Sequence, residues 1–327
     1  MERLVLLVRA QNLDQARQRA RQSLERFDSD RSVLQRLDVI CGDLAHCDLL
    51  EEVRTQLTHV VHAAAHTSFL SVRTSRETNV EGTRALAEVV TSAPRLERFL
   101  FIGTAYRCGV VEASVLGEDV PPSDSHVAEY TRTKADAEAV LENIRDLPLI
   151  VARPSIIIGH TTLGVVPSAS LYWYYWALAR AGVSPFVPTR RRDIVPVDWV
   201  AAAIIHLLFL PQPHFRRYHL SAGEGSAVSW ASIHETFARF GEALPTTEHL
   251  DLGALADHPA WARLEFESRA KMAVMACAKF SAVPVGAFSN QRILGEGVAA
   301  PPPFTSYLPR CIQTNRRSLN QLALDDA

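Results

Sequence analysis

The sequence predicts an α/β protein built around a doubly wound parallel sheet. In its first 160 residues, short and almost continuous apolar runs alternate with longer stretches of helical pattern. Strands that are apolar throughout and separated by helices are typical of parallel sheets covered on both faces. The chain has 327 residues, of which 47% are hydrophobic and 21% charged, and this composition suits one large or two modest globular domains.

Five strands are expected in this first half. Leu4–Val8 is a run of apolar residues that ends at Arg9, and Gly42 follows the second run. Gly103 stops the fourth run, and Pro154 ends the fifth. The expected strands are Leu4–Val8, Leu37–Cys41, Thr58–His62, Phe99–Ile102 and Leu147–Ala152.

Three helices are expected between these strands. Asn12–Phe27 is rich in Ala, Gln, Arg and Leu, which are good helix formers. Asn79–Thr91 is the second helix, and Pro94 closes it. Tyr130–Ile144 is the third, directly before the last of the five strands.

The regular alternation of expected strands and helices ends after about residue 160. Helices are expected over Ser168–Ala181, Asp198–Leu210 and Ser229–Phe240, with a short strand at Tyr218–Ser221. We therefore expect a first domain over residues 1–160 and a smaller, mostly helical domain over residues 161–327. The first of these helices holds the densest aromatic run of the chain, which predicts either the wall of an acyl or aryl channel or ordinary core packing.

The composition excludes several classes of protein. Lys and Arg number 34 against 36 Asp and Glu, a balance that excludes a polybasic nucleic-acid binder. The five cysteines form no CxxC pair, which favours a reducing compartment and hence a cytoplasmic protein. The twelve histidines show one HxxxH spacing, His62 and His66, but these two flank an alanine-rich turn and are expected to shape a binding site rather than to bind a metal, so no metal site is expected. No apolar run approaches the length of about 20 residues that a membrane span needs.

One pair of side chains points to proton-transfer chemistry. Tyr130 and Lys134 are four residues apart in an expected helix and so share one face. An ammonium group beside a phenol is expected to lower the tyrosine pKa from its usual value of about 10. Thr104 follows an expected strand at the edge where open α/β sheets bind ligands.

The order of motifs resembles the extended short-chain dehydrogenase/reductase superfamily, whose sheet is Rossmann-type. Within it, the chain is most similar to fatty acyl-CoA reductases and to the thioester reductase domains of carboxylic acid reductases and peptide synthetases. The similarity covers roughly residues 1–225 and rests on the segments Leu6–Arg9, Val60–Ala65, Asn79–Thr83, Thr104, Tyr130–Lys134, Arg153–Gly159 and Asp193–Asp198.

The resemblance implies a catalytic role for three residues. Thr104 would hydrogen-bond the substrate carbonyl oxygen, and Tyr130 would donate a proton to it. Lys134 would tune Tyr130 and hold the nicotinamide ribose. The implied cofactor is NADP, used as NADPH, and Arg9 would bind its 2′-phosphate.

Further residues would contact the same cofactor. Their implied roles are to lie near the adenine, to let the backbone approach the cofactor, or to flank the nicotinamide. These residues are Asp43, Leu44, Ala63, Ala64, Ala65, Asn79, Pro154 and Ser155, together with Tyr130 and Lys134.

The same resemblance exposes a departure from the family pattern. The family places a strand and a glycine-rich turn before Leu4–Val8, whereas this chain has no glycine before Gly42. Three explanations stay open: Met1 is an internal methionine of a longer reading frame, the chain is a shortened and non-catalytic relative, or Leu4–Val8 has moved into the central position. We expect a gap beside Leu4–Val8 and weakened binding of NADPH, because the turn normally supplies amide donors to the pyrophosphate.

The expected function is NADPH-dependent reduction of an acyl thioester, carried on coenzyme A or on a carrier protein, to an aldehyde or alcohol. One alternative is an NAD(P)-dependent oxidoreductase, epimerase or dehydratase acting on a nucleotide sugar, a sterol or another secondary alcohol. The other is a non-catalytic binding protein derived from such an enzyme. Expected partners are a carrier protein or a second copy of the chain. Arg190–Arg192 is expected to be a solvated loop, with attraction of substrate phosphates as the alternative.

Overall fold

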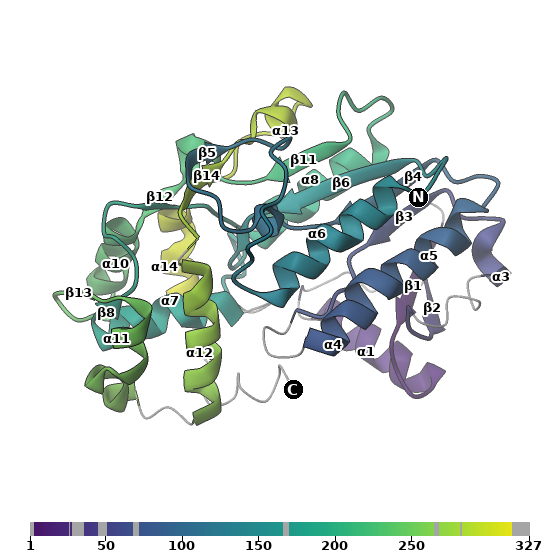
Figure 1. The fold of residues 1–327 in the computed structure, drawn as a ribbon. Coiled ribbons are helices and arrows are strands. Elements are labelled where there is room, and N and C mark those ends of the chain that lie inside the picture. The colour runs from purple at the N-terminus through teal and green to yellow at the C-terminus, as the bar shows by residue number, and fades with distance from the viewer. Residues whose placement is uncertain are drawn as a thin grey trace.

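Figure 1 shows the computed structural model of the protein. The structure describes residues 3–25, 27, 36–44, 51–67, 72–165, 170–264, 268–281 and 283–315.

A four-stranded parallel sheet forms the centre of the fold. Its order is β11-β6-β4-β3, and the register places Phe101 opposite Val151 and Pro154 opposite Leu220. The strands are β3 (His59–His62), β4 (Arg98–Ile102), β6 (Leu149–Pro154) and β11 (Arg217–Leu220). Every residue of β6 is buried, as expected for a central parallel strand. The predicted doubly wound parallel sheet is thereby confirmed.

Two further strands stand apart from this sheet. β1 (Leu4–Val8) and β2 (Leu37–Cys41) pair with each other in parallel, and no described strand joins β1 to β3. All of β1 is only half-buried, and Val61 on β3 is 42% exposed. Of the three explanations offered above, the third is wrong for this structure, because β1 keeps its place beside β2. The expected gap in the pairing is present.

Helices cover both faces of the sheet (Figure 1). α5 (Gly82–Thr91) and α6 (Glu129–Glu142) pack on the face that carries Phe99, Phe101 and Val151. α8 (Val197–Phe209) packs on the opposite face, against Leu100 and Ile150. The alternation of neighbouring strand residues between the two clusters follows from the pleat of the strands. α1 (Leu13–Glu25) buries Ala16 and Ala20 against β1 and β2.

The helix expected to begin at Asn79 begins earlier. α4 (Val72–Arg76) leads without a break into a π-helical turn, η2 (Glu77–Glu81), and then into α5. Asn79 and Val80 are buried within this π turn. A π turn adds a residue to the helical repeat and therefore leaves no 3.6-residue signature in the sequence.

The second half builds a core of its own. Its main helices are α7 (Ser170–Ala181), α10 (Trp230–Arg239), α12 (Ser268–Ser281) and α14 (Phe304–Thr314). β5 (Ala113–Leu116) and β14 (Val285–Phe288) pair in parallel beside this core. Since β11 and α8 also come from this half yet join the central sheet, the division at residue 160 stays a prediction.

Short elements complete the fold. Three pairs of two-residue strands connect the larger parts: β7 (Ile156–Ile157) with β10 (Ile194–Val195), β9 (Arg191–Arg192) with β12 (Val228–Ser229), and β8 (Val183–Ser184) with β13 (Glu248–His249). Short helices do the same, and they are α3 (Glu51–Arg54), η3 (Ala105–Cys108), α9 (Gly223–Ser226), α11 (Leu252–Asp257), η4 (Pro259–Leu264) and α13 (Gln291–Gly295).

The aromatic run of α7 belongs to the core of the second half. Tyr172, Trp173, Tyr174 and Tyr175 are each less than 5% exposed and contact one another edge to face. Trp176 is half-buried and donates a hydrogen bond from Nε1 to Glu242 at 2.9 Å. Ordinary core packing accounts for this helix, the second of the two interpretations offered above.

The arginine run after α7 is not a solvated loop throughout. Arg192 is buried, with its guanidinium 4.6 Å from the centre of the Phe186 ring, whereas Arg191 is exposed and donates to the carbonyl oxygen of Glu224. The expectation of solvation is therefore wrong for Arg192, because its pairing in β9 turns the side chain into an aromatic core.

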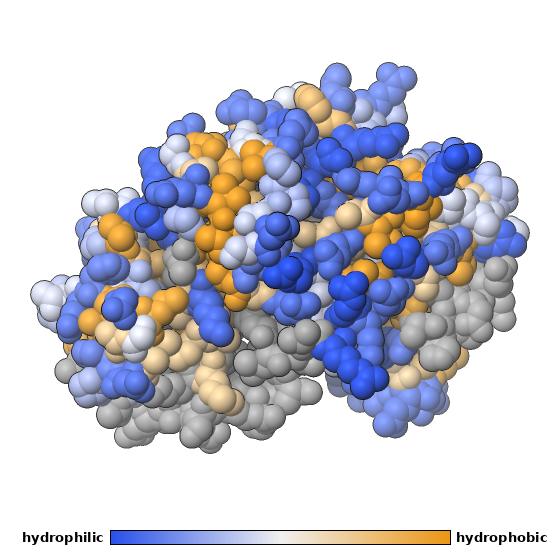
Figure 2. Space-filling model, viewed as in Figure 1, coloured by the Kyte–Doolittle hydropathy of each residue, from blue (hydrophilic) through white to orange (hydrophobic). Residues whose placement is uncertain are grey.

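On the face seen in Figure 2, hydrophilic side chains are interspersed with smaller apolar areas. Along the described part of the chain, no helix is both long and apolar enough to cross a bilayer.

Candidate active site

The carboxyl ends of three central strands meet at one edge of the sheet. β3 runs into Ala63, β4 into Thr104 and β6 into Ser155. The amide of Gly103 donates to the carbonyl oxygen of Ala152 at 2.8 Å, so pairing continues to the residue before Thr104. Thr104 is 7% exposed and caps η3 by accepting a hydrogen bond from the Tyr106 amide at 3.3 Å.

α6 brings the predicted pair to this edge. Tyr130 lies in its first turn and is half-buried, and Lys134 follows one turn later at 3% exposure. The Lys134 ammonium sits 4.4 Å from the centre of the Phe101 ring, on the strand that leads to Thr104. Because α6 also packs against η3, the phenol, the ammonium and the hydroxyl come from adjoining elements.

Burial controls the charge of both side chains. It lowers the pKa of Lys134 to about 7, with the charge of Glu138 acting in the opposite direction. It raises the pKa of Tyr130 to about 12. The expectation that Lys134 lowers the tyrosine pKa is wrong for this structure, because the shift is caused by burial, which penalises the charged phenolate. Tyr130 is thus a protonated hydrogen-bond donor at neutral pH.

Asn79 joins the turn after β3 to α6. Its Nδ2 donates to the carbonyl oxygen of His66 and to the Thr133 hydroxyl, both at 3.0 Å, and its Oδ1 accepts from the His66 amide at 2.7 Å. Both side-chain amide hydrogens of Asn79 are therefore used in hydrogen bonds within the protein. These bonds hold the turn after β3 next to Thr133, the residue before Lys134, and the contact between Asn79 and a cofactor stays a prediction.

His62 extends this network below the site. Its Nε2 lies 2.7 Å from the Thr83 hydroxyl, which in turn donates to the carbonyl oxygen of Asn79 at 2.6 Å. Since that hydroxyl has a single hydrogen, Nε2 must be the donor, and this fixes the tautomer of the ring. Burial, followed by the nearby charge of Lys134, lowers the pKa of His62 to about 3, so the ring is neutral.

The residues predicted to meet the adenosine half of the cofactor lie after β1 and β2. Arg9 is exposed, and Asp43 is half-buried. The Gly42 amide donates to the carbonyl oxygen of Val8 at 3.1 Å, so the two strand ends lie together. Leu44 is buried in the core against Gly82, and its contact with a cofactor stays a prediction.

The alanine turn leaves its backbone open. Ala63 and Ala64 are exposed and Ala65 is half-buried, so the part of the chain that the structure describes leaves the end of β3 accessible. A flat group could lie against this turn with Lys134 close to it. The small side chains, the buried cation and the exposed Arg9 fit a dinucleotide at its nicotinamide and 2′-phosphate ends.

Pro154 and Ser155 are both buried at the end of β6. Ser155 lies beside the carboxylate of Asp193, which also accepts amide hydrogen bonds from Ala222 at 2.7 Å and Phe288 at 2.9 Å. Burial raises the pKa of Asp193 to about 6. The sequence singled out Asp193 only as part of a motif, and the structure adds that its side chain ties three separate segments to the floor of the site.

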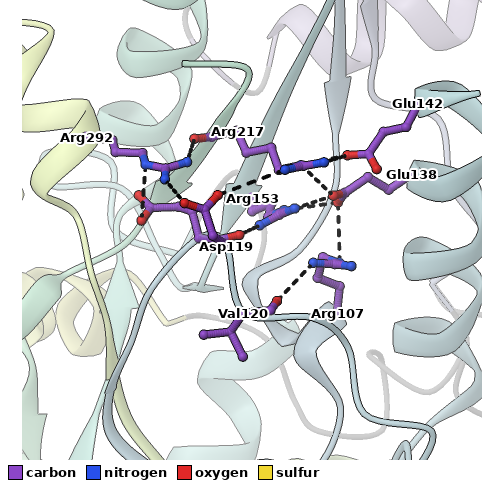
Figure 3. Close-up of polar contacts among 9 residues, drawn as sticks. Arg107, Asp119, Val120, Glu138, Glu142, Arg153, Arg217 and Arg292 are labelled. Atoms are coloured by element: carbon purple, nitrogen blue, oxygen red, sulfur yellow. Dashed lines mark hydrogen bonds and ion pairs between the residues drawn. The ribbon is translucent and has the colours of Figure 1, made fainter. Parts of the chain in front are cut away.

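A charged network borders the site, and the sequence analysis did not anticipate it (Figure 3). Glu138 on α6 forms a buried ion pair with Arg153 on β6, and Arg107 and Arg217 approach the same carboxylate. The available signal was the four-residue spacing between Lys134 and Glu138, which places a carboxylate on the catalytic face of the helix. In the described ranges, no group of three or more His, Cys, Asp or Glu side chains is arranged to hold a metal ion.

Comparisons with known proteins agree with this arrangement. The curated nonribosomal peptide synthetase asaC of Aspergillus flavus is 26% identical over 236 residues, 65% of this chain and 23% of that protein. The aldehyde reductase lnaA of the same fungus is 25% identical over 174 residues, 49% of this chain and 16% of its own length. The chain thus spans less than a quarter of the length of these curated relatives.

Solved structures show the same fold. The terminal R domain from the myxalamid PKS-NRPS biosynthetic pathway superposes with a TM-score of 0.79 at 21% identity, covering 95% of this chain and 83% of that one. A thiolation-reductase di-domain from an archaeal non-ribosomal peptide synthetase gives a TM-score of 0.74 at 15% identity, with 98% and 70% covered. The model of the Male sterility protein family matches residues 1–204, more than half of the chain, and the chain therefore belongs to this family of extended short-chain dehydrogenases/reductases.

Proposed function

We propose that the protein is an NADPH-dependent oxidoreductase that reduces acyl thioesters to aldehydes or alcohols. The observation that supports the proposal is that Thr104, Tyr130 and Lys134 come from adjoining elements, with α6 packed against η3 and Lys134 lying over Phe101 of β4. The names of relatives support the substrate class, because they include peptide synthetases and aldehyde reductases. A carrier-bound acyl group is the substrate we favour, with the carrier protein as partner.

The residues present suit the cofactor at two places. Lys134 would hold the ribose next to the nicotinamide, over the open backbone of Ala63 and Ala64 and beside Ser155. Arg9 would pair with a 2′-phosphate, which is the basis for preferring NADP to NAD. Asp43 would lie near the adenine. The bound nicotinamide supplies a hydride.

The side chains would act on the substrate oxygen. As the thioester carbonyl carbon accepts the hydride, Thr104 donates a hydrogen bond to the oxygen and Tyr130 gives it a proton, which yields a hemithioacetal. Breaking the carbon–sulfur bond then releases an aldehyde and a free thiol. A second hydride and a second proton would convert the aldehyde to an alcohol. Solvent returns the proton to Tyr130.

The test is direct measurement of the reaction. The purified chain is mixed with NADPH and a panel of acyl-CoA and acyl-phosphopantetheine thioesters, and cofactor oxidation, free thiol and carbonyl product are followed together. We expect one thiol for each aldehyde formed. Oxidation of secondary alcohols without thioester reduction would contradict the proposal, and so would failure to bind any nicotinamide nucleotide.

Cofactor preference has its own test. Arg9→Ala should raise the KM for NADPH by roughly tenfold or more, because one charge-assisted hydrogen bond contributes about 1.5–3 kcal/mol. The KM for NADH should stay unchanged. Equal effects on both nucleotides would argue against a 2′-phosphate contact at Arg9.

A further inference from the structure

We propose that Glu138 is the positioning residue of this site: its carboxylate fixes α6 against the elements that carry Thr104 and Ser155, and it presents a negative charge to Lys134. The inference rests on the proposed reductase function and deepens it. Glu138 is 2% exposed and lies one helical turn after Lys134, on the same face of α6. Within the described ranges its hydrogen-bond and ion-pair partners are Arg107, Arg153 and Arg217, so it would act through its neighbours.

Both oxygens of this carboxylate are bound by Arg153. Nε of Arg153 donates to Oε2 at 3.0 Å, and Nη2 donates to Oε1. The third contact of Arg153, from Nη1 to the carbonyl oxygen of Glu118, is 2.6 Å long. Arg153 directly precedes Pro154 and Ser155. The two-point pair therefore fixes α6 relative to the strand end that would flank the nicotinamide.

Two more arginines approach Glu138 from other elements (Figure 3). Nε of Arg107, three residues after Thr104, lies 3.7 Å from Oε2. Nε of Arg217, the first residue of β11, lies 3.9 Å from Oε1. One carboxylate thus connects η3, β6 and β11 to the helix that carries Tyr130 and Lys134. Moving it would disturb three sides of the site together.

The surroundings of Lys134 make this carboxylate electrostatically important. β4 presents the uncharged ring of Phe101 to the ammonium, and β3 presents His62, which is neutral. Tyr130 from α6 is protonated at neutral pH. Glu138 is the charged group that opposes the loss of the lysine proton caused by burial. The Glu138 carboxylate also forms ion pairs with Arg107, Arg153 and Arg217.

The chain offers a direct way to measure this effect. It has only three lysines, Lys134, Lys271 and Lys279, so lysine labelled with ¹³C at Cε gives three signals in an NMR spectrum. Lys134→Arg identifies the signal of interest. The titration midpoint of that signal is then measured in the wild type, in Glu138→Gln and in Glu142→Gln. Glu142 is a matched control, because it lies one turn further along α6 and pairs with Arg217 at 2.6 Å.

We expect the midpoint of Lys134 to fall by about one pH unit or more in Glu138→Gln, since an opposite charge nearby shifts a pKa by about 1–3 units. Glu142→Gln should leave it unchanged. The alkaline limb of kcat/KM for thioester reduction should move to lower pH by the same amount in Glu138→Gln only. An unshifted Lys134 in folded Glu138→Gln, or an equal shift in both variants, overturns the proposal.

A second variant covers the case in which Glu138→Gln does not fold. Arg107→Gln removes a competing cation, so the Lys134 midpoint should rise, and an unchanged or lower midpoint overturns the proposal. The titration needs no catalytic activity. If the wild type reduces no thioester, the proposed function fails, whereas the NMR result still decides the role of Glu138.

Discussion

Burial of the Lys134 ammonium group destabilises the folded protein at neutral pH. Lys134 is 3% exposed, and its pKa falls from 10.5 to about 7 because it is removed from water. The unfolded chain therefore binds a proton that the folded chain lacks between about pH 7 and pH 10.5. The free energy of unfolding therefore rises with pH across this window, and the destabilisation caused by the buried lysine is complete below about pH 7. A group kept under such strain near neutral pH is typical of a functional site.

Lys134→Met should stabilise the protein most at pH 6–7. The advantage over the wild type should shrink as the pH rises, by up to about 1.4 kcal/mol per pH unit between pH 7 and pH 10. Urea unfolding at several pH values measures this difference. An advantage that stays constant with pH would contradict a depressed lysine pKa.

Asn79→Ala should loosen the turn after β3. It leaves both backbone groups of His66 without the Asn79 side chain, which costs about 1–3 kcal/mol for buried groups, and it removes the bond that the Thr133 hydroxyl accepts from Nδ2. Both the free energy of unfolding and the catalytic activity should be lower in this variant than in the wild type. Asn143→Ala is the matched control, because the exposed Asn143, at the end of α6, donates one side-chain hydrogen bond, to the carbonyl oxygen of Ala139. Similar losses in both variants would argue against a special role for Asn79.

At the scale of elements, close approach between α5 and the loop after β2 depends on one glycine. A Cβ placed on Gly82 would lie 2.7 Å from Cβ of Leu44, and neither atom can move without its backbone. Leu44 is buried in the core under α5. In the segment Asn79–Thr83, the glycine is thus needed for close packing, and Asn79 is needed for its hydrogen bonds.

Gly82→Ala should destabilise the protein by about 1–3 kcal/mol through overpacking, although alanine is the better helix former by about 1 kcal/mol. Gly225→Ala is the control, because a Cβ there meets nothing within 4 Å. Thermal unfolding of the two variants measures the difference. A stabilised Gly82→Ala would show that the loop yields freely.

Local patterns predicted the strands well. Leu37–Cys41 matches β2 at both ends, because an apolar run bounded by Gly42 leaves little freedom. They placed Thr104, Tyr130 and Lys134 on the elements that carry them, although the catalytic roles stay proposals. They could not predict the π turn at Asn79 or the raised tyrosine pKa. These features depend on burial and on contacts such as Glu138 with Arg153, which join residues fifteen positions apart.

At the scale of the whole molecule, two buried histidines govern the response to acid. Burial lowers the pKa of His62 and of His219 to about 3. The unfolded chain binds protons at both positions below about pH 6.5, so their contribution to stability is complete above that pH and is lost as the pH falls towards 3. Asp193, whose pKa is raised to about 6, opposes this trend between about pH 3.8 and pH 6.

The free energy of unfolding should therefore fall steadily from pH 6.5 towards pH 4. His219→Gln should flatten this dependence by up to about 1.4 kcal/mol per pH unit, because glutamine does not titrate. Guanidinium unfolding at several pH values tests this. A slope that does not differ between the variant and the wild type would show that His219 is protonated in the folded state.

The most direct test of the account is single-turnover reduction of an acyl thioester by the wild type and by Tyr130→Phe. We expect the wild type to release one thiol for the first NADPH consumed, and Tyr130→Phe to lose about 100-fold or more in rate while retaining its fold. A Tyr130→Phe variant that turns over at the wild-type rate would contradict the assignment of the phenol as proton donor.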